Sequence, residues 1–480
     1  MHQGNLVADG ATKLCRHASK KDSIRAILPL FIRPQQVYNS PIHTKGGPPM
    51  QRQVTAVIVG AGNRSANVYA TLALSHPERL KIVGLVDPDP VRLRLIREKY
   101  QVPQENCFAD VNELVARNKF ADVVINGTMD ELHVATSLPV LEKGYDLLLE
   151  KPFAVNEEEM QLLVDTANRL GRKVYICHVL RYAPFYGAIK RSILRGDIGE
   201  IISIELCEHV SYHHMGVSYV RGKWRSEKLC HAPMLLAKSC HDIDLMMWLV
   251  RRKPEAVASF GGEFQFGPGK KPAGAGTRCM ADCPHSRECP FTAEGNYLTD
   301  PTRWAQYVWK SLEGEGELTP ERQRESLMTD NPYGRCAWDF ERDGNVDHQS
   351  VLVRFEGGVT GVFNMVGGTA RPERNIHVIG TRGEIKGTFE DQKYILRRIA
   401  PFAPRGYEEE VIDLGHQGDT TGAQGGHGGG DLRLVEDFLD AICGEEASIS
   451  ATEINDSTIS HRVVFRAMRA MVNGSVETIE

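Results

Sequence analysis

The stretch Val54-Thr-Ala-Val-Ile-Val-Gly60-Ala-Gly62-Asn-Arg-Ser65-Ala66 joins a β-branched apolar run to two closely spaced glycines. The apolar run Val54–Val59 predicts a buried parallel strand. Gly60 permits a tight turn and Gly62 lets the backbone approach a pyrophosphate, while the start of the following helix offers free N–H groups to that anion. Ser65 replaces the third glycine of the usual pattern, so the motif alone also fits an ordinary strand–helix turn.

Strands and helices alternate on the C-terminal side of this turn. Further short apolar runs lie at residues 82–86, 122–125, 147–149 and 174–177. Residues 156–170 carry apolar side chains at helical spacing, with Asn156 placed to cap the start and Gly171 to end the helix. This alternation over residues 51–177 predicts a doubly wound parallel sheet, that is, a Rossmann domain.

An acidic residue follows the second predicted strand. Asp87 stands where a carboxylate can accept hydrogen bonds from a ribose 2′-hydroxyl. Because the same carboxylate repels a 2′-phosphate, NAD is favoured over NADP, although Arg64 and Arg92 could offset that repulsion and leave NADP open. Strand, glycines and acid together predict a dinucleotide site that includes Gly60, Gly62, Asn63, Arg64 and Asp87.

The pattern changes in the second half of the chain. Residues 351–355 alternate between apolar and polar, Gly357-Gly358 makes a turn, and residues 378–385 carry a second hairpin pattern. We therefore expect residues 178–480 to form an α+β domain, for substrate binding and oligomerisation, with a large, mostly antiparallel sheet covered by helices on one face. Residues 265–335 are polar and rich in Gly and Pro, which predicts a long irregular insertion.

Glu150-Lys151-Pro152 follows a predicted strand of the first sheet. The carboxyl ends of parallel strands form the edge at which open α/β sheets bind ligands. A lysine there can polarise a hydroxyl or a carbonyl group. The alternative is a surface lysine in a strand-to-helix loop, and the residues alone leave both interpretations open.

Several stretches together carry a family resemblance. The glycine turn, Asp87, residues 128–133, residues 150–152 and residues 240–244 resemble the Gfo/Idh/MocA oxidoreductases in order and spacing. That family includes glucose–fructose oxidoreductase and inositol dehydrogenases, and the resemblance covers about residues 51–442. It implies a Rossmann domain followed by an open-faced antiparallel sheet, with hydride transfer between NAD(P) and a sugar or polyol carbon. It adds Thr128, His133 and Glu150 as candidates for the cofactor site. It also implies that Lys151 is a catalytic residue that positions both the substrate and the cofactor.

His241 is the candidate general base. Its near-neutral pKa suits removal of a hydroxyl proton while hydride leaves the same carbon, whereas the alternative is a structural histidine at a helix end. In many relatives an aspartate stands four residues before this histidine, but here that position is Ala237. Lys238 follows it and is a candidate catalytic partner, unless it only stabilises Asp242 or Asp244.

Candidate substrate contacts come from two sources. Residues 219–225 gather phenol, guanidinium and indole groups that can hydrogen-bond hydroxyls or stack on a sugar ring, although an ordinary polar loop is the alternative. The resembling stretches add further polar side chains. The candidates are Arg181, Tyr182, Tyr219, Arg221, Trp224 and Asp242. The Gly-rich residues 415–430 predict a linker, or a cover that brings His427 near the substrate.

The insertion contains a cysteine cluster. Thiolates grouped in a segment with no visible core could bind a structural zinc ion, which needs four ligands. Free or packed thiols are the alternative, because the spacing is not the tighter C-x2-C pairing. The candidate ligands are Cys279, Cys283 and Cys289 in the insertion and Cys336 downstream of it.

The composition restricts the class of protein. A net charge of −5 over 480 residues does not favour nucleic acid or an anionic membrane, and no run of about 18 apolar residues is present. The 11 cysteines lie mostly in apolar runs, as expected for reduced thiols in the cytoplasm. Residues 1–50 are basic and predict a disordered leader, with a mitochondrial presequence as the alternative.

These features predict an NAD(P)-dependent dehydrogenase that oxidises a secondary alcohol of a sugar, cyclitol or sugar acid. The expected partner is a small sugar-like molecule, and by analogy with the family the protein is expected to be a homo-oligomer. Two other functions stay open at this point. One is an NAD-dependent glycosidase or epimerase-like enzyme that recycles its cofactor, and the other is a non-catalytic nucleotide sensor.

Overall fold

The computed structural model describes residues 52–267, 269–415 and 427–480. The leader expected over residues 1–50 lies outside these residues. Within the described part of the chain, no helix has the length and apolar character needed to cross a membrane.

The first sheet is the predicted parallel one. Its strands are β1 (Val54–Val59), β2 (Leu80–Val86), β3 (Cys107–Phe108), β4 (Val123–Asn126), β5 (Asp146–Leu149) and β6 (Val174–Ile176). The order is β3-β2-β1-β4-β5-β6, and every described pair is parallel. The chain runs outward in both directions from β1 and β4, so the carboxyl ends of these two strands form the switch point at which such sheets bind ligands.

Helices connect these strands as expected from their sequences. The glycine turn leads into the short helical turns η2 (Asn63–Val68), η3 (Tyr69–Thr71) and α1 (Leu72–Ser75), and the later connections are α2 (Pro90–Tyr100), α3 (Val111–Ala116), α4 (His133–Glu142) and α5 (Glu157–Leu170). The predicted cap of α5 is present, because Asn156 accepts a hydrogen bond from the Glu159 backbone N–H at 2.8 Å. Gly171 ends the helix in the left-handed conformation, as predicted.

The second sheet has nine strands among the described residues. They are β7 (Ile201–Ser211), β8 (Pro254–Gly262), β9 (His348–Phe355), β10 (Thr360–Thr369), β11 (Glu373–Gly380), β12 (Gly383–Thr388), β13 (Lys393–Ile399), β14 (Tyr407–Asp413) and β15 (Val476–Thr478). Their order is β14-β13-β12-β11-β7-β10-β9-β8-β15. Both predicted hairpins, β9–β10 and β11–β12, are present and antiparallel. The sheet is mixed, because β7 and β10 pair in parallel.

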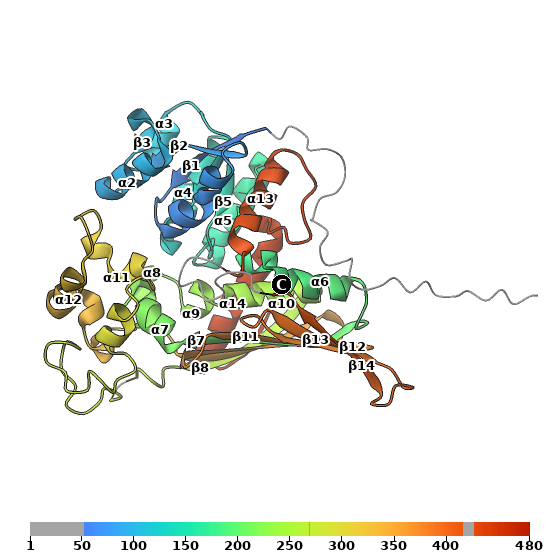
Figure 1. The fold of residues 1–480 in the computed structure, drawn as a ribbon. Helices are drawn as coiled ribbons and strands as arrows, with labels where there is room; N and C mark the ends of the chain where they lie inside the picture. The colour runs from blue at the N-terminus through green and yellow to red at the C-terminus, as the bar shows by residue number, and fades with distance from the viewer. Residues whose placement is uncertain (1–51, 268, 416–426) are drawn as a thin grey trace, which may run out of the picture. The chain divides into compact units, whose positions relative to one another are not determined.

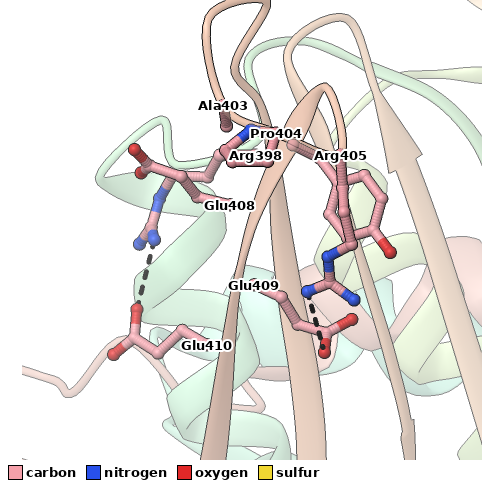
Figure 2. A pocket seen from close by; sticks show the side chains of 8 residues that line it. Arg398, Ala403, Pro404, Arg405, Glu408, Glu409 and Glu410 are labelled. Carbon is pink, nitrogen blue, oxygen red and sulfur yellow. Dashed lines mark hydrogen bonds and ion pairs between the residues drawn. The ribbon is translucent and has the colours of Figure 1, made fainter.

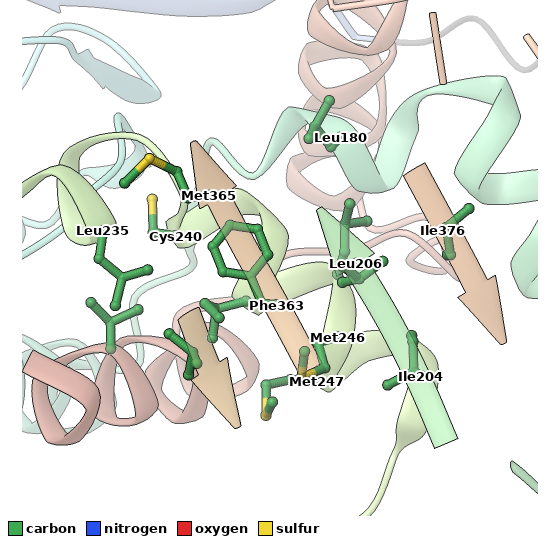
Figure 3. Close-up of a cluster of buried hydrophobic side chains, with 14 of the residues drawn as sticks. Leu180, Ile204, Leu206, Leu235, Cys240, Met246, Met247, Phe363, Met365 and Ile376 are labelled. Atoms are coloured by element: carbon green, nitrogen blue, oxygen red, sulfur yellow. The ribbon is translucent and has the colours of Figure 1, made fainter. Parts of the chain in front are cut away.

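One face of the second sheet is covered by α6 (Pro184–Leu194), α10 (Cys240–Val250) and α14 (Ile454–Asn473) (Figure 1). Apolar side chains of the helices and strands form one core, in which Phe363 of β10 and Leu206 of β7 lie beside Met246 of α10 (Figure 3). This core holds α10, and with it the candidate base, in a fixed position above the sheet.

Helix α13 (Gly430–Ile442) returns from the end of the chain to the first sheet (Figure 1). Leu434, Val435 and Phe438 belong to the same buried cluster as β1 and β4. The ring of Phe438 lies 5.4 Å from that of Tyr175 on β6. The Rossmann domain is therefore completed by a helix that lies outside residues 51–177.

The insertion is more ordered than its composition suggests. It contains η9 (Glu294–Leu298), α11 (Ala305–Val308), η10 (Lys310–Leu312), α12 (Pro320–Thr329) and η11 (Pro332–Gly334), and η12 (Ala337–Asp339) follows it. Tyr297, Trp304, Trp309 and Leu327 form a small core of their own. The described residues between β8 and η9 form no helix or strand, as predicted. The expectation that the segment lacks a core is wrong, because a few large aromatic side chains supply buried apolar surface.

Candidate active site

The glycine turn has the geometry of a dinucleotide cradle. Gly60 has φ +77°, and a Cβ atom on it would lie 2.7 Å from the Thr128 backbone nitrogen. At Gly62 the nearest atom to an added Cβ is the Gly127 carbonyl oxygen at 3.9 Å, so the backbone there is open to a ligand. Ser65 is tolerated in place of the third glycine because Gly127 makes the close approach: a Cβ on Gly127 would lie 2.9 Å from the Ser65 Cβ. The residues present therefore fit a dinucleotide.

Asp87 lies at the carboxyl end of β2, beside this turn. Its carboxylate accepts hydrogen bonds from the Ala61 N–H at 2.8 Å and the Asp89 N–H at 2.9 Å. The Arg92 guanidinium lies 3.4 Å from the same carboxylate. These contacts hold the carboxylate at the rim of the cradle, as the sequence predicted for a ribose-binding acid.

The other predicted cofactor residues lie on the same sheet edge. Asn63 begins η2, directly after the open Gly62. Thr128 follows β4, and its hydroxyl donates to Asn126 at 2.9 Å. His133 begins α4, and its Nδ1 donates to the Pro152 carbonyl oxygen at 2.6 Å. That bond ties the β4 loop to the Glu150-Lys151-Pro152 loop.

Arg64 and Glu150 belong to a buried ion network. Arg64 donates to Glu150 at 2.8 Å, to Tyr69 at 2.5 Å and to Asp431 of α13 at 2.5 Å. Burial alone would raise the pKa of Glu150, but the charges of Arg64 and Lys151 hold it below its usual value. The network joins the glycine turn, the β5 loop and α13 at one point.

Lys151 reaches the segment of chain that leads into His241. The Lys151 Nζ donates to the carbonyl oxygen of Ala237 at 2.7 Å, at the end of the short helix α9 (Met234–Ala237) and four residues before His241. His241 is 4% exposed, and its Nδ1 has no hydrogen-bond partner among the residues that the structure describes. Burial, followed by the positive charge of Lys151, lowers the pKa of His241 well below its ordinary value. The imidazole is thus neutral and able to accept a proton.

A second imidazole reaches His241 from the Gly-rich segment. The rings of His427 and His241 lie 5.9 Å apart, and the Nδ1 of His427 lies 3.0 Å from the Asp431 carboxylate. Gly428 and Gly429 have positive φ, and a Cβ on Gly430 would lie 2.3 Å from the Val179 carbonyl oxygen. The three glycines therefore set the turn that brings His427 close to the base. Residues 416–426, the rest of the predicted cover, lie outside the described residues.

Lys238 lies in a buried cluster of charges. Its Nζ is 2.8 Å from Glu208 of β7, which Arg374 of β11 contacts at 2.5 Å. Arg374 also lies 3.2 Å from Asp242. Burial raises the pKa of Asp242 well above its ordinary value, and the nearby Glu208 carboxylate adds to that effect. The suggestion that Lys238 stabilises a neighbouring acid thus has a geometric basis, although the acid it contacts is Glu208.

Two of the predicted substrate residues line the approach to the first sheet. The indole N–H of Trp224 donates to Asp130 at 2.9 Å, in the loop after β4. The ring of Tyr219 lies 6.3 Å from that of Trp224. Both are aromatic groups between the cofactor edge and the insertion.

Three other residues that the sequence predicted to contact the substrate are bonded to protein groups instead. Arg181 makes a two-point ion pair with Asp244 at 2.6 and 2.7 Å. The hydroxyl of Tyr182 donates to Asp437 of α13 at 2.8 Å. Arg221 points into the insertion and donates to the Phe291 carbonyl oxygen at 2.6 Å. Each is committed to holding elements together, because each is buried and satisfied by protein groups.

The zinc hypothesis is not supported. Among the described residues there is no group of three or more His, Cys, Asp or Glu side chains that could hold a metal ion. The Sγ of Cys279 lies instead 3.5 Å from the Arg221 guanidinium, inside the core of the insertion. Like the other proposed ligands Cys283, Cys289 and Cys336, it is a free thiol. The core that the sequence did not reveal orders this segment through apolar contacts.

A separate hollow lies on the β13–β14 hairpin (Figure 2). It is lined by charged side chains that pair with one another, such as Arg398 with Glu410 at 3.1 Å and Arg405 with Glu409 at 3.8 Å. None of the predicted site residues lines it. The hollow is therefore distinct from the candidate active site.

Comparison with known proteins identifies the family. Residues 54–178 match the model of an oxidoreductase family with an NAD-binding Rossmann fold, and residues 190–479 match the C-terminal alpha/beta domain of the same family. The chain belongs to the Gfo/Idh/MocA oxidoreductase family. This Gfo/Idh/MocA protein is thus an NAD-binding oxidoreductase, and the predictions of family, fold class and enzyme class are confirmed.

Individual relatives agree with this assignment. The Gfo/Idh/MocA chain is 26% identical to a putative oxidoreductase, YteT, of Bacillus subtilis over 83% of this chain and 94% of that protein. It is 23% identical to inositol 2-dehydrogenase of Corynebacterium glutamicum over 43% of this chain and 57% of that protein. Its fold resembles the WlbA dehydrogenase of Bordetella pertussis, solved with NADH and UDP-GlcNAcA, with a TM-score of 0.57, 15% identity and coverage of 89% of this chain and 99% of that chain.

The sequence analysis missed several residues of the site. His178 lies two residues after the end of β6, on the same sheet edge as Lys151, so the strand-end rule that found the lysine could also have found it. The ring of His178 lies 5.8 Å from that of His241. Glu208 and Arg374 lie on two strands of the second sheet and carried no local signal.

Proposed function

We propose that this protein is an NAD-dependent dehydrogenase that oxidises a secondary alcohol of a sugar, cyclitol or sugar acid. The observation that carries the proposal is a buried, neutral His241 beside the ammonium of Lys151, at the edge of a sheet whose glycine turn fits a dinucleotide. The name of the Corynebacterium relative, inositol 2-dehydrogenase, supports a polyol as the substrate class.

The cofactor would be held by three parts of the first domain. Gly60, Gly62, Asn63 and Arg64 would face the pyrophosphate, and Asp87 would accept hydrogen bonds from the ribose. Thr128, His133 and Glu150 lie on the same edge and would border the nicotinamide end. When bound, the nicotinamide supplies the acceptor for a hydride.

Lys151 and His241 would divide the work on the substrate. The ammonium donates a hydrogen bond to the reacting hydroxyl oxygen, and the imidazole takes the hydroxyl proton as the C–H hydride leaves the same carbon. The alcohol becomes a carbonyl, which the same ammonium continues to polarise. The lowered pKa keeps the His241 imidazole unprotonated at neutral pH, so its lone pair is free for the proton, while the same shift makes it a weaker base than an exposed histidine.

Substrate hydroxyls would meet polar and aromatic groups on the other side of the site. Lys238 is the second cation, while Tyr219 and Trp224 offer ring faces on which a sugar can stack. Asp242 and Arg374 lie directly behind Lys238 and fix the position of Glu208. In this arrangement Lys238, paired with Glu208, is a positioning residue.

We also propose that the protein is a homo-oligomer that associates through the second sheet. The face opposite the helices exposes apolar side chains, among them Ile202, Leu352 and Val366. Apolar patches of this kind mark association surfaces. Light scattering on the purified protein tests this, and a strictly monomeric mass would contradict it.

The experiment that tests the function is a screen of sugars, cyclitols and sugar acids with NAD and NADP, followed at 340 nm. Lys151→Ala and His241→Ala should each lower kcat/KM by about 100-fold or more, since proton transfer and polarisation contribute factors of this size. Lys228→Ala is the matched control, because Lys228 is an exposed lysine paired with Asp343. Unchanged turnover in Lys151→Ala, or substrate conversion without any NADH, would contradict the proposal.

A further inference from the structure

The insertion reaches the adenosine end of the dinucleotide cradle. Its turn η10 is followed by Glu313 and by Gly314, which has φ +81°. A Cβ atom on Gly314 would lie 2.6 Å from a methyl carbon of Val91, at the start of α2. The backbone of the insertion thus packs directly on the helix that follows Asp87.

This tip is held in place from within the insertion. Trp309, immediately before η10, is 3% exposed, and its indole N–H donates to the Pro301 carbonyl oxygen at 2.9 Å. Asn331 donates to the Val308 carbonyl oxygen at 2.8 Å. The backbone N–H of Glu313 donates to the Lys310 carbonyl oxygen at 3.2 Å. The position of Glu313 is therefore set by a buried core and a hydrogen-bonded turn.

Glu313 completes a ring of carboxylates around Arg92. The guanidinium lies 3.4 Å from Asp87, 3.4 Å from Asp89 and 3.2 Å from Glu313. Although burial alone would lower the pKa of Arg92, the three carboxylates raise it, and its side chain is 17% exposed. Three negative charges thus surround one positive charge, beside the acid that faces the ribose.

An arginine at this place is the group that would receive a ribose 2′-phosphate. A phosphate would need the free donors of the guanidinium, and it would be repelled by any carboxylate that already holds them. Asp87 and Asp89 come from the first domain itself, whereas Glu313 is supplied by the insertion. The insertion adds the charge that makes the rim clearly anionic.

We propose that Glu313 is a cofactor-specificity residue. Its ion pair with Arg92 prevents the guanidinium from binding a 2′-phosphate, and in this way the insertion restricts the enzyme to NAD. This inference rests on the proposed dinucleotide site. Without Glu313, one side of the guanidinium is open and the charge of the rim falls by one unit. The 2′-phosphate of NADP can then bind Arg92, while the uncharged 2′-hydroxyl of NAD still donates its hydrogen bond to Asp87.

Titration of the full-length protein with NADH and NADPH, followed by nicotinamide fluorescence, tests this without a substrate. Glu313→Gln should tighten NADPH binding about tenfold, since a charge-assisted contact replaces a repulsion, and should leave NADH binding within about twofold. Glu315→Gln is the matched control, because Glu315 lies on the same tip and pairs with Arg322 at 3.2 Å. Adding Arg92→Ala to Glu313→Gln should abolish the gain.

Four outcomes would overturn the inference. The first is an unchanged NADPH affinity in Glu313→Gln, and the second is an equal loss of affinity for NADH and NADPH in that variant. The third is an equal gain of NADPH affinity in Glu315→Gln. The fourth is a wild-type protein that binds NADPH as tightly as NADH. Failure of every variant and of the wild type to bind either cofactor would contradict the proposed function itself, and that result is distinct from the other four.

Discussion

Four imidazoles lie in a row through the candidate site. The ring centres of His427, His241, His178 and His461 are separated in turn by 5.9, 5.8 and 5.6 Å. Burial is the first cause that lowers the pKa of each of them. The row is therefore uncharged at neutral pH, and the positive charge at its centre is that of Lys151.

The pH dependence of catalysis follows from this. A lowered pKa keeps His241 in its basic form when the pH falls, so the acid limb of the kcat/KM profile should lie below pH 6.5, the value of an unperturbed histidine. Initial rates between pH 5 and 8 measure it. A limb centred at or above pH 6.5 would exclude His241, in the environment described, as the base.

The sequence predicted the residues of this site unevenly. Lys151 and Glu150 could be predicted because they follow a strand of a parallel sheet, where position alone implies proximity to a ligand. Glu208 and Arg374 could not, because they meet only through the register of β7 with β11, two strands far apart in the chain. Arg181 was misjudged since a buried arginine and a substrate-binding one look the same in a sequence.

At the scale of helices and strands, the local sequence was sufficient to predict which strands pair when the connection between them is short. The glycines between β9 and β10 and between β11 and β12 predicted both hairpins. The parallel pairing of β7 with β10 has no such signal, because the intervening chain includes the whole insertion. Tertiary packing decides that pair, and local sequence does not report it.

The ion pair between η6 (Val179–Tyr182) and α10 offers a test at this scale. Arg181→Met should lower the free energy of unfolding by about 3–5 kcal/mol, because it leaves Asp244 charged and buried without its partner. Chemical denaturation measures this, and Arg405→Met serves as the control, since Arg405 is an exposed residue of the β13–β14 hairpin. A loss of less than about 1 kcal/mol would show that the pair is not a main contact between the two elements.

For the molecule as a whole, neutral buried histidines predict acid sensitivity. The Nε2 of His461 accepts a hydrogen bond from the Phe153 N–H, which requires an unprotonated nitrogen. Burial, followed by His178, lowers its pKa well below that of the unfolded chain. The unfolded state then binds more protons below about pH 6.5, so stability is full above that pH and is lost as the pH falls.

Thermal unfolding between pH 8 and pH 5 measures this. His461→Gln should reduce the fall in Tm below pH 6.5, because an amide cannot be protonated there. His76→Gln, at an exposed histidine paired with Glu78, should keep the wild-type fall. Equal slopes for wild type and His461→Gln would place the acid sensitivity elsewhere.

Helix α13 has a consequence for synthesis on the ribosome. The strands of the first sheet are translated first, but Leu434, Val435 and Phe438, which bury one side of that sheet, are translated only after strands β7 to β14 of the second sheet. Domains usually fold as they emerge, N-terminal first. Here the nascent first domain must wait with an uncovered apolar surface, so chaperone binding to stalled chains should end only once residue 442 has left the exit tunnel.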